Sequence, residues 1–239
     1  MSAVVRPRFY PLISFALVAV VLVGFSRTYY LRLFSGPLPL TTLVHVHAAL
    51  FTAWLALFVA QVLLVAAHRV DLHRKLGIAS AVFAVLVIAV GILTVLQSAT
   101  SNRVSPSGLA PPQFSIIGFT SIGMFAVFLT LGVAFRRRPG LHRRFMILAM
   151  VAATSPATSR LLRIFDVQHH RDALIPGLAA LFIVACLVHD WRKYRTVHPV
   201  YVIGGLMIVA SWPLRLMIGH SAWYFPIGEG VARIARTIF

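Results

Sequence analysis

The chain has 239 residues, of which 59% are hydrophobic and only 11% are charged, and its mean hydropathy is +0.89. An apolar share this large excludes an ordinary soluble domain, and uncharged runs of about 18 or more residues recur along the whole length. The formal net charge of +17 would favour nucleic-acid binding in a soluble protein, but here the basic residues flank apolar runs, where they meet lipid headgroups. Composition therefore predicts an all-α, polytopic transmembrane helix bundle of one domain, with the lipid bilayer as its partner and no nucleic-acid partner.

Seven membrane crossings are predicted along the chain. The first, residues 9–26, follows a basic leader, Met1 to Arg8. A cleaved signal peptide is the alternative, but this run is long enough to span and no small-x-small site follows it before Arg27. The other crossings are predicted at residues 41–67, 76–97, 114–135, 145–163, 173–189 and 200–217. The tail after Met217 is either a short helix in the membrane interface or a frayed terminus.

The distribution of basic residues predicts the orientation. With the N-terminus in the cytoplasm, thirteen of the 22 Lys and Arg residues fall on the inner side and nine on the outer side. Their density is highest in the connection RRRPGLHRR, residues 136–144. Because cytoplasmic loops carry the excess of Lys and Arg, we expect the N-terminus inside and the C-terminus outside.

The second crossing carries polar residues that need partners. His45 and His47 stand near its outer end, but two residues correspond to about 200° of helix, so the two rings cannot share one partner. Gln61 lies in mid-crossing, where an amide without a hydrogen bond is costly. For any one histidine at a helix end, contact with headgroups or water remains the alternative to a functional role.

A repeat near the inner side is more specific. DLHRKLG opens the third crossing and GLHRRFM opens the fifth, which indicates a degenerate repeat of helix pairs. His73 and His142 therefore lie at matched depth, each heading a helix face of mostly small residues. Two imidazoles so placed are what bis-histidine ligation of haem b between helices needs. The alternative is an interfacial helix start whose imidazole binds a lipid phosphate.

The fifth crossing ends in ATSPATSRLLRIFD, where Pro156 is expected to break the helix beside Arg160. A broken helix next to charged residues is typical of a ligand or ion site, and an ordinary helix end with snorkelling arginines is the alternative. A copper, zinc or iron site on the outer side is a further candidate, with ligands from His45, His47, His169 and His170. No acidic residue is placed in mid-bilayer, which disfavours a carrier built on a buried carboxylate. The single cysteine, Cys186, is interpreted as a packing residue.

The motifs HVH, HRKLG and HRRFM, followed by a Pro/Ser/Thr-rich helix, resemble those of a group of uncharacterised bacterial multi-pass inner-membrane proteins with HR-x-x-G and HRR-x-M signatures. The similarity covers roughly residues 9–165. More distantly, the chain resembles the cytochrome b561 arrangement and small proteins of terminal-oxidase assembly. The b561 resemblance implies haem ligands on neighbouring helices, and His73 and His142 match its inner pair.

Three functions follow from these patterns. The leading hypothesis is a b-type haem protein that transfers electrons or serves a respiratory complex, with His73 and His142 ligating an inner haem and His45 or His47 an outer one. The second is an accessory or assembly subunit without a cofactor. The third is a small-molecule or metal transporter that uses the broken fifth helix.

Overall fold

The computed structural model describes residues 9–36, 40–102, 105 and 107–239. The leader, residues 1–8, and the loop residues Pro37, Arg103 and Pro106 lie outside the described residues. The described part is built from helices, and it contains no β-strand. In chain order the elements are α1 Phe9–Phe25, η1 Ser26–Tyr30, η2 Leu31–Phe34, α2 Thr42–Ala66, α3 Val70–Ser98, α4 Pro111–Ala134, α5 Pro139–Ala152, α6 Ser155–Ile164, η3 Gln168–His170, α7 Arg171–Tyr194, α8 Pro199–His220 and α9 Phe225–Ile238.

The helix starts follow from local chemistry. Thr41 precedes α2, and its hydroxyl accepts a hydrogen bond from the backbone N–H of Val44 at 3.4 Å. Proline occupies the first turn of α4, α5, α6, α8 and α9. A backbone N–H in the first turn has no acceptor within the helix, so the lack of one in proline costs no hydrogen bond. These local signals set where the helices begin, while their apolar surfaces set where they pack.

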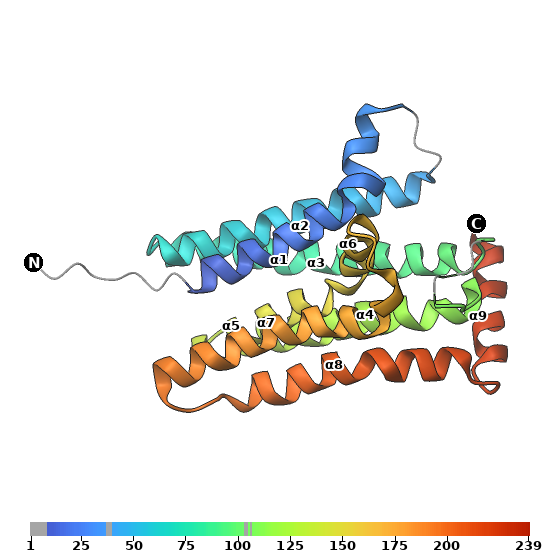
Figure 1. Ribbon diagram of the computed structural model, residues 1–239. Helices are drawn as coiled ribbons and strands as arrows, with labels where there is room; N and C mark the ends of the chain where they lie inside the picture. Colours follow the sequence, from blue (N-terminus) through green and yellow to red (C-terminus); the bar gives the residue numbers. More distant parts are fainter. Residues whose placement is uncertain (1–8, 37–39, 103–104, 106) are drawn as a thin grey trace, which may run out of the picture.

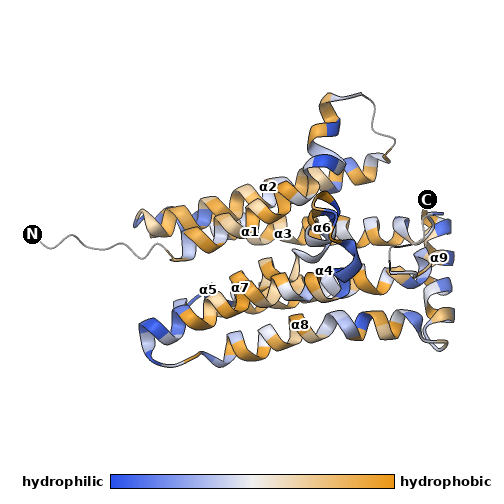
Figure 2. Cartoon of the chain, viewed as in Figure 1, coloured by the Kyte–Doolittle hydropathy of each residue, from blue (hydrophilic) through white to orange (hydrophobic). Residues whose placement is uncertain are grey.

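Within the described residues, six helices are long and apolar enough to cross a membrane, and α5 with α6, bent by 48°, makes a seventh if the pair is one span. The predicted polytopic helix bundle is therefore confirmed. Apolar residues cover the flanks of the bundle and polar residues gather near its ends (Figure 2). Large apolar side chains such as Ile78 on α3, which is 74% exposed, point outward, as expected for a surface that faces lipid.

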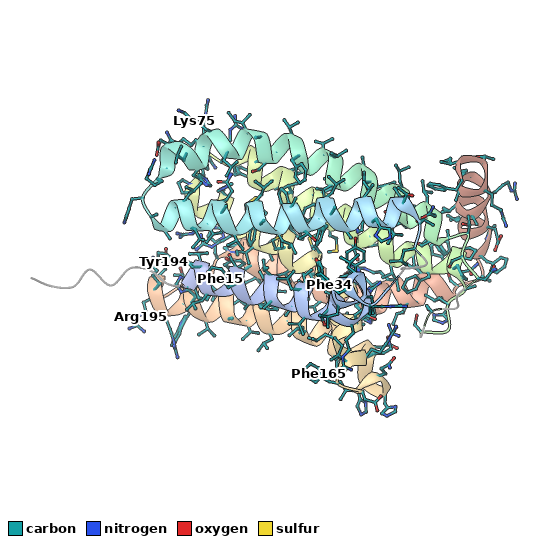
Figure 3. The ribbon with its side chains drawn as sticks, turned by 90° about the horizontal axis from the view of Figure 1, so that it is seen from above. Phe15, Phe34, Lys75, Phe165, Tyr194 and Arg195 are labelled. Carbon is teal, nitrogen blue, oxygen red and sulfur yellow. The ribbon has the colours of Figure 1, made fainter. Side chains whose placement is uncertain are left out.

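The helices form two layers (Figure 1). One holds α1, α2 and α3, the other holds α4, α5, α7 and α8, and α9 lies across one end. Lys75, Tyr194 and Arg195 lie at the opposite end (Figure 3). We call that end, which holds residues 66–75, 134–144 and 190–199, the basic end, and we call the other the α9 end. The core between the layers includes Trp54, whose Nε1 donates to the Met150 sulfur at 3.4 Å, and the buried Cys186 is part of the same core, as predicted.

The fifth predicted crossing is corrected in detail. Its helix begins at Pro139 and stops at Ala152, so the break precedes Pro156, which lies in the first turn of α6. At the break, Thr154 donates to the carbonyl of Val151 from its hydroxyl at 2.7 Å and from its backbone N–H at 3.1 Å, which satisfies that carbonyl. Here α6 leaves the bundle, and Phe165 lies where it protrudes (Figure 3).

The end of the sixth crossing also differs from its prediction, and the structure decides between the two alternatives for the tail. The sixth crossing was predicted to end at residue 189, but α7 continues to Tyr194, so Asp190 lies inside a helix and is fully buried. Asp190 lies near the end of α7, at the basic end, and its burial there was not predicted. The tail is a helix, α9, rather than a frayed terminus.

Candidate functional site

The two histidines of the predicted repeat meet at the basic end. His73 lies in the first turn of α3 and His142 in the first turn of α5. Their ring centroids are 6.0 Å apart and the ring planes are inclined by 72°. Both rings are half-buried. The sequence spacing thus brings two imidazoles from different helices into contact.

The tautomer of His142 is set by α4. Its Nδ1 lies 2.7 Å from the carbonyl oxygen of Gly132, and because that oxygen can only accept, Nδ1 carries the proton and Nε2 has a free lone pair. Gly132 lets α5 approach closely, since a Cβ there would lie 2.8 Å from the sulfur of Met146. A glycine on α4 therefore helps to seat the ring of His142.

Gln61 was predicted to lie in mid-crossing, but it lies near the end of α2 and bonds to the start of α3. Its amide nitrogen donates to Nδ1 of His73 at 2.6 Å and to the carbonyl of His73 at 3.1 Å. Its oxygen accepts from the Ser80 hydroxyl at 3.2 Å and from the backbone N–H of Gly77 at 2.9 Å. This orientation follows from the network, because the opposite one would face the amide oxygen toward the carbonyl of His73. Gln61 thereby ties α2 to the start of α3.

The remaining predicted ligands lie apart from this pair. Nδ1 of His45 lies 3.2 Å from the hydroxyl of Tyr29, whereas His47 stacks on Phe51 with ring centroids 6.1 Å apart. His169 and His170 are exposed on η3. Within the part of the chain that the structure describes, no three His, Cys, Asp or Glu side chains gather into a possible metal site. The outer haem and the outer metal site stay predictions.

Arg160, which was predicted to mark a ligand site, is held by local contacts. Its Nη1 donates to the carbonyl of Pro156 at 2.9 Å, and its guanidinium lies 4.3 Å from the ring centroid of Phe25 on α1. Helix α1 packs closely on α6, since a Cβ on Gly24 would overlap the carbonyl of Ala157. The role of Arg160 in a ligand site stays a prediction, while these contacts join α6 to α1.

Sequence reasoning missed a buried ion pair at the basic end. Arg144 of α5 donates from Nε and Nη2 to the two oxygens of Asp190 at 2.9 and 2.8 Å, and from Nη1 to the carbonyl of Gly140 at 2.7 Å. Asp190 is 0% exposed and Arg144 5%. Tyr201 of α8 packs against this pair, its ring centroid 5.7 Å from the guanidinium carbon. The only signal in the sequence was the acidic residue in VHDWRKY, between an apolar run and a basic one.

Beside this ion pair, His198 precedes α8 and caps it. Its Nδ1 accepts a hydrogen bond from the backbone N–H of Val200 at 3.2 Å. Burial lowers the pKa of His198 below its ordinary value of 6.5, and the nearby charge of Arg144 lowers it further. The neutral ring is therefore the form that caps the helix.

A second missed group lies toward the α9 end. Arg215 falls within the predicted crossing 200–217 and is buried in the structure. An arginine inside an apolar run was the available signal, and it was interpreted only as an interfacial charge.

Comparisons of the chain with protein-family models, curated proteins and solved structures give no match.

Proposed function

We propose that this membrane protein binds a b-type haem at the basic end through His73 and His142 and serves in electron transfer or in a respiratory complex. The contact between the two imidazoles carries the proposal. The ring centroids lie 6.0 Å apart, one imidazole at the start of α3 and one at the start of α5, so His73 and His142 would be the residues that hold the haem iron. Two protein ligands suffice for a haem, whereas a bare metal ion in a protein usually needs three or more.

The hydrogen bonds of His142 fit this role. A ligating histidine usually donates its second ring N–H to a carbonyl or carboxylate, which fixes the tautomer and the orientation of the ring. The bond from Nδ1 of His142 to the carbonyl of Gly132 has this form and leaves Nε2 for a metal. No rearrangement of His142 is therefore required.

His73 fits with one adjustment. Because the amide nitrogen of Gln61 donates to its Nδ1, the ring proton lies on Nε2. Ligation through Nε2 requires that this proton move to Nδ1 and that the hydrogen bond from Gln61 to Nδ1 be given up. Metal binding commonly displaces a ligand proton in this way. Gln61 is thus a positioning residue that holds His73 through its Nδ1 and its carbonyl in the form without haem.

The haem would supply one-electron oxidation and reduction, and the protein would set its position and potential. The basic end carries Arg74, Lys75 and the arginines of residues 136–138, which places positive charge around the proposed site. In the proposed orientation this end faces the cytoplasm of a bacterium, because cytoplasmic loops are rich in Lys and Arg. A partner that docks here would carry complementary negative charge.

Absorption spectroscopy with iron analysis on detergent-purified protein tests the proposal. We expect a Soret band and about one iron per chain, both lost in His73→Ala and in His142→Ala. His170→Ala, which changes an exposed histidine far from the pair, is the matched control and should keep the band. Purified protein without a Soret band, even after haem supplementation during expression, would leave an accessory subunit without cofactor as the better explanation.

A further inference from the structure

Arg215 of α8 is a buried cation bound only by neutral groups. Its side chain is 4% exposed. Nη1 donates to the Ser121 hydroxyl at 2.9 Å, and Nη2 donates to the Ser211 hydroxyl at 2.8 Å and to the Met124 sulfur at 3.2 Å. Its Nε–H has no partner among the described residues. None of the groups that contact this guanidinium carries a charge.

No carboxylate of the described residues pairs with Arg215. All five acidic residues lie in the described part of the chain, and none of them contacts Arg215 there. Four of them lie beside other arginines instead, in the pairs Arg69–Asp71, Arg144–Asp190, Arg171–Asp172 and Arg236–Glu229, and the fifth, Asp166, is exposed. A lone charge inside a membrane bundle is strongly unfavourable unless it is paired or hydrated. The charge of Arg215 therefore calls for a counter-ion from solution.

A small cavity lies against this guanidinium. Arg215 lines it together with Trp212 and Ser211 of α8, Ser155 at the start of α6, and Pro176 of α7. The centre of a water-sized sphere can occupy about 20 Å³ of it. On that measure one water molecule needs about 10–15 Å³, so the cavity holds one water or one monatomic ion.

The polar groups at the cavity suit a negative charge. The indole of Trp212 is 4% exposed, and its N–H, a donor only, has no partner among the described residues. The Ser155 hydroxyl lies 3.2 Å from that of Ser121, which accepts from Arg215. Ser155 is also the first residue of α6, and it lines the same cavity. Arg215 and Trp212, each with an unpartnered N–H, and the first residue of α6 thus line one small volume.

We propose that this cavity binds a single chloride ion, held by Arg215 and Trp212. Chloride supplies the missing charge, which water does not, and it is little larger than water. Sulfate and phosphate are too large for the volume. The ion joins α8 to the break between α5 and α6, so its binding stabilises this part of the bundle. The proposal is independent of the haem, because the cavity lies away from His73 and His142.

Chloride binding to the detergent-purified full chain tests this. Equilibrium dialysis with radioactive chloride, at constant ionic strength in gluconate, should show saturable binding of about one ion per chain. The melting temperature should rise by roughly 5–10 °C between chloride-free buffer and chloride at about a hundred times its dissociation constant. Wild-type protein without saturable binding overturns the proposal, whether the cavity then holds water or nothing.

Three variants locate the ion. Arg215→Met should weaken chloride binding at least tenfold, and Arg236→Met, which removes an exposed arginine of α9, should leave it unchanged. Trp212→Phe removes only the indole N–H and should weaken binding at least threefold, which keeps the test decisive if Arg215→Met does not fold. Binding that survives either change in the cavity at wild-type strength places the ion elsewhere and overturns the proposal.

Discussion

Replacing Asp190 with asparagine should destabilise the bundle more than any other isosteric change at its basic end. Two of the three hydrogen bonds of Arg144 go to this carboxylate, and both side chains are excluded from solvent. The asparagine would keep one acceptor oxygen, but it would turn an NH₂ group toward the guanidinium and leave the positive charge unbalanced. Breaking a buried ion pair by removing one partner costs about 3–5 kcal/mol.

The loss is large enough to measure by thermal unfolding. For a chain of this size, 1 kcal/mol shifts the melting temperature by about 2–4 °C, so Asp190→Asn should lower it by roughly 6–20 °C. Circular dichroism in detergent, with the wild type and the variant in the same micelles, follows the transition. Glu229→Gln is the matched control, because the Arg236–Glu229 pair is longer, at 3.8 Å, and exposed, and it should cost at most about 1 kcal/mol.

The double variant Arg144→Met with Asp190→Leu separates charge from packing. Removing both charges leaves no lone ion, and such replacements are often neutral or stabilising, so the double variant should be more stable than either single one. The reasoning would be refuted by a loss below about 1 kcal/mol for Asp190→Asn, which is the value of an exposed pair. It would also be refuted if the effects of the two single changes simply added.

Three further predictions follow from single contacts. The lowered pKa of His198 means that protonation of its ring is disfavoured in the folded chain, so the stability should fall as the pH drops below 6.5. His198→Asn still caps α8, and its melting temperature should lose that part of the pH dependence. Gly24→Leu should lower the free energy of unfolding by at least about 1–3 kcal/mol, because the added Cβ would overlap the backbone of Ala157. The control Ala79→Leu changes an exposed helix position and should change the melting temperature little. Pro156→Ala should change the free energy of unfolding by less than about 1 kcal/mol, because Pro156 lies in the first turn of α6, and a larger loss would mean that the proline itself makes the break.

The crossings could be predicted from the sequence because hydropathy is a local property of the chain. A run of about twenty apolar residues must span, whatever it packs against. The meeting of His73 and His142 was also predictable, since the two HR motifs open helices at the same depth. The need of Gln61 for a partner followed from its place in an apolar run, and only the identity of the partners required the structure.

The buried charges were not predictable in the same way. Arg144 and Asp190 lie 46 residues apart, and each has basic neighbours in the sequence, a pattern typical of a segment that faces water. In a membrane bundle the lipid-facing and core-facing sides of a helix are both apolar, so the pattern of α8 does not tell which way Arg215 points. Its direction follows from the packing of α8 on Ser121 of α4, which is a tertiary contact.

The start of α5 carries both His142 and Arg144. Within one turn, His142 bonds to Gly132 of α4 and Arg144 bonds to Asp190 of α7, so the first turn of α5 is clamped from two sides. The same clamp fixes the direction in which the ring of His142 meets His73. Asp190 does not contact the imidazole pair, but it has a second expected effect under the proposal that His73 and His142 bind haem. In protein that still folds, Asp190→Asn should then weaken haem retention, whereas Glu229→Gln should not. An Asp190→Asn protein that loses stability but holds haem as tightly as the wild type would show that the Gly132 contact alone seats His142.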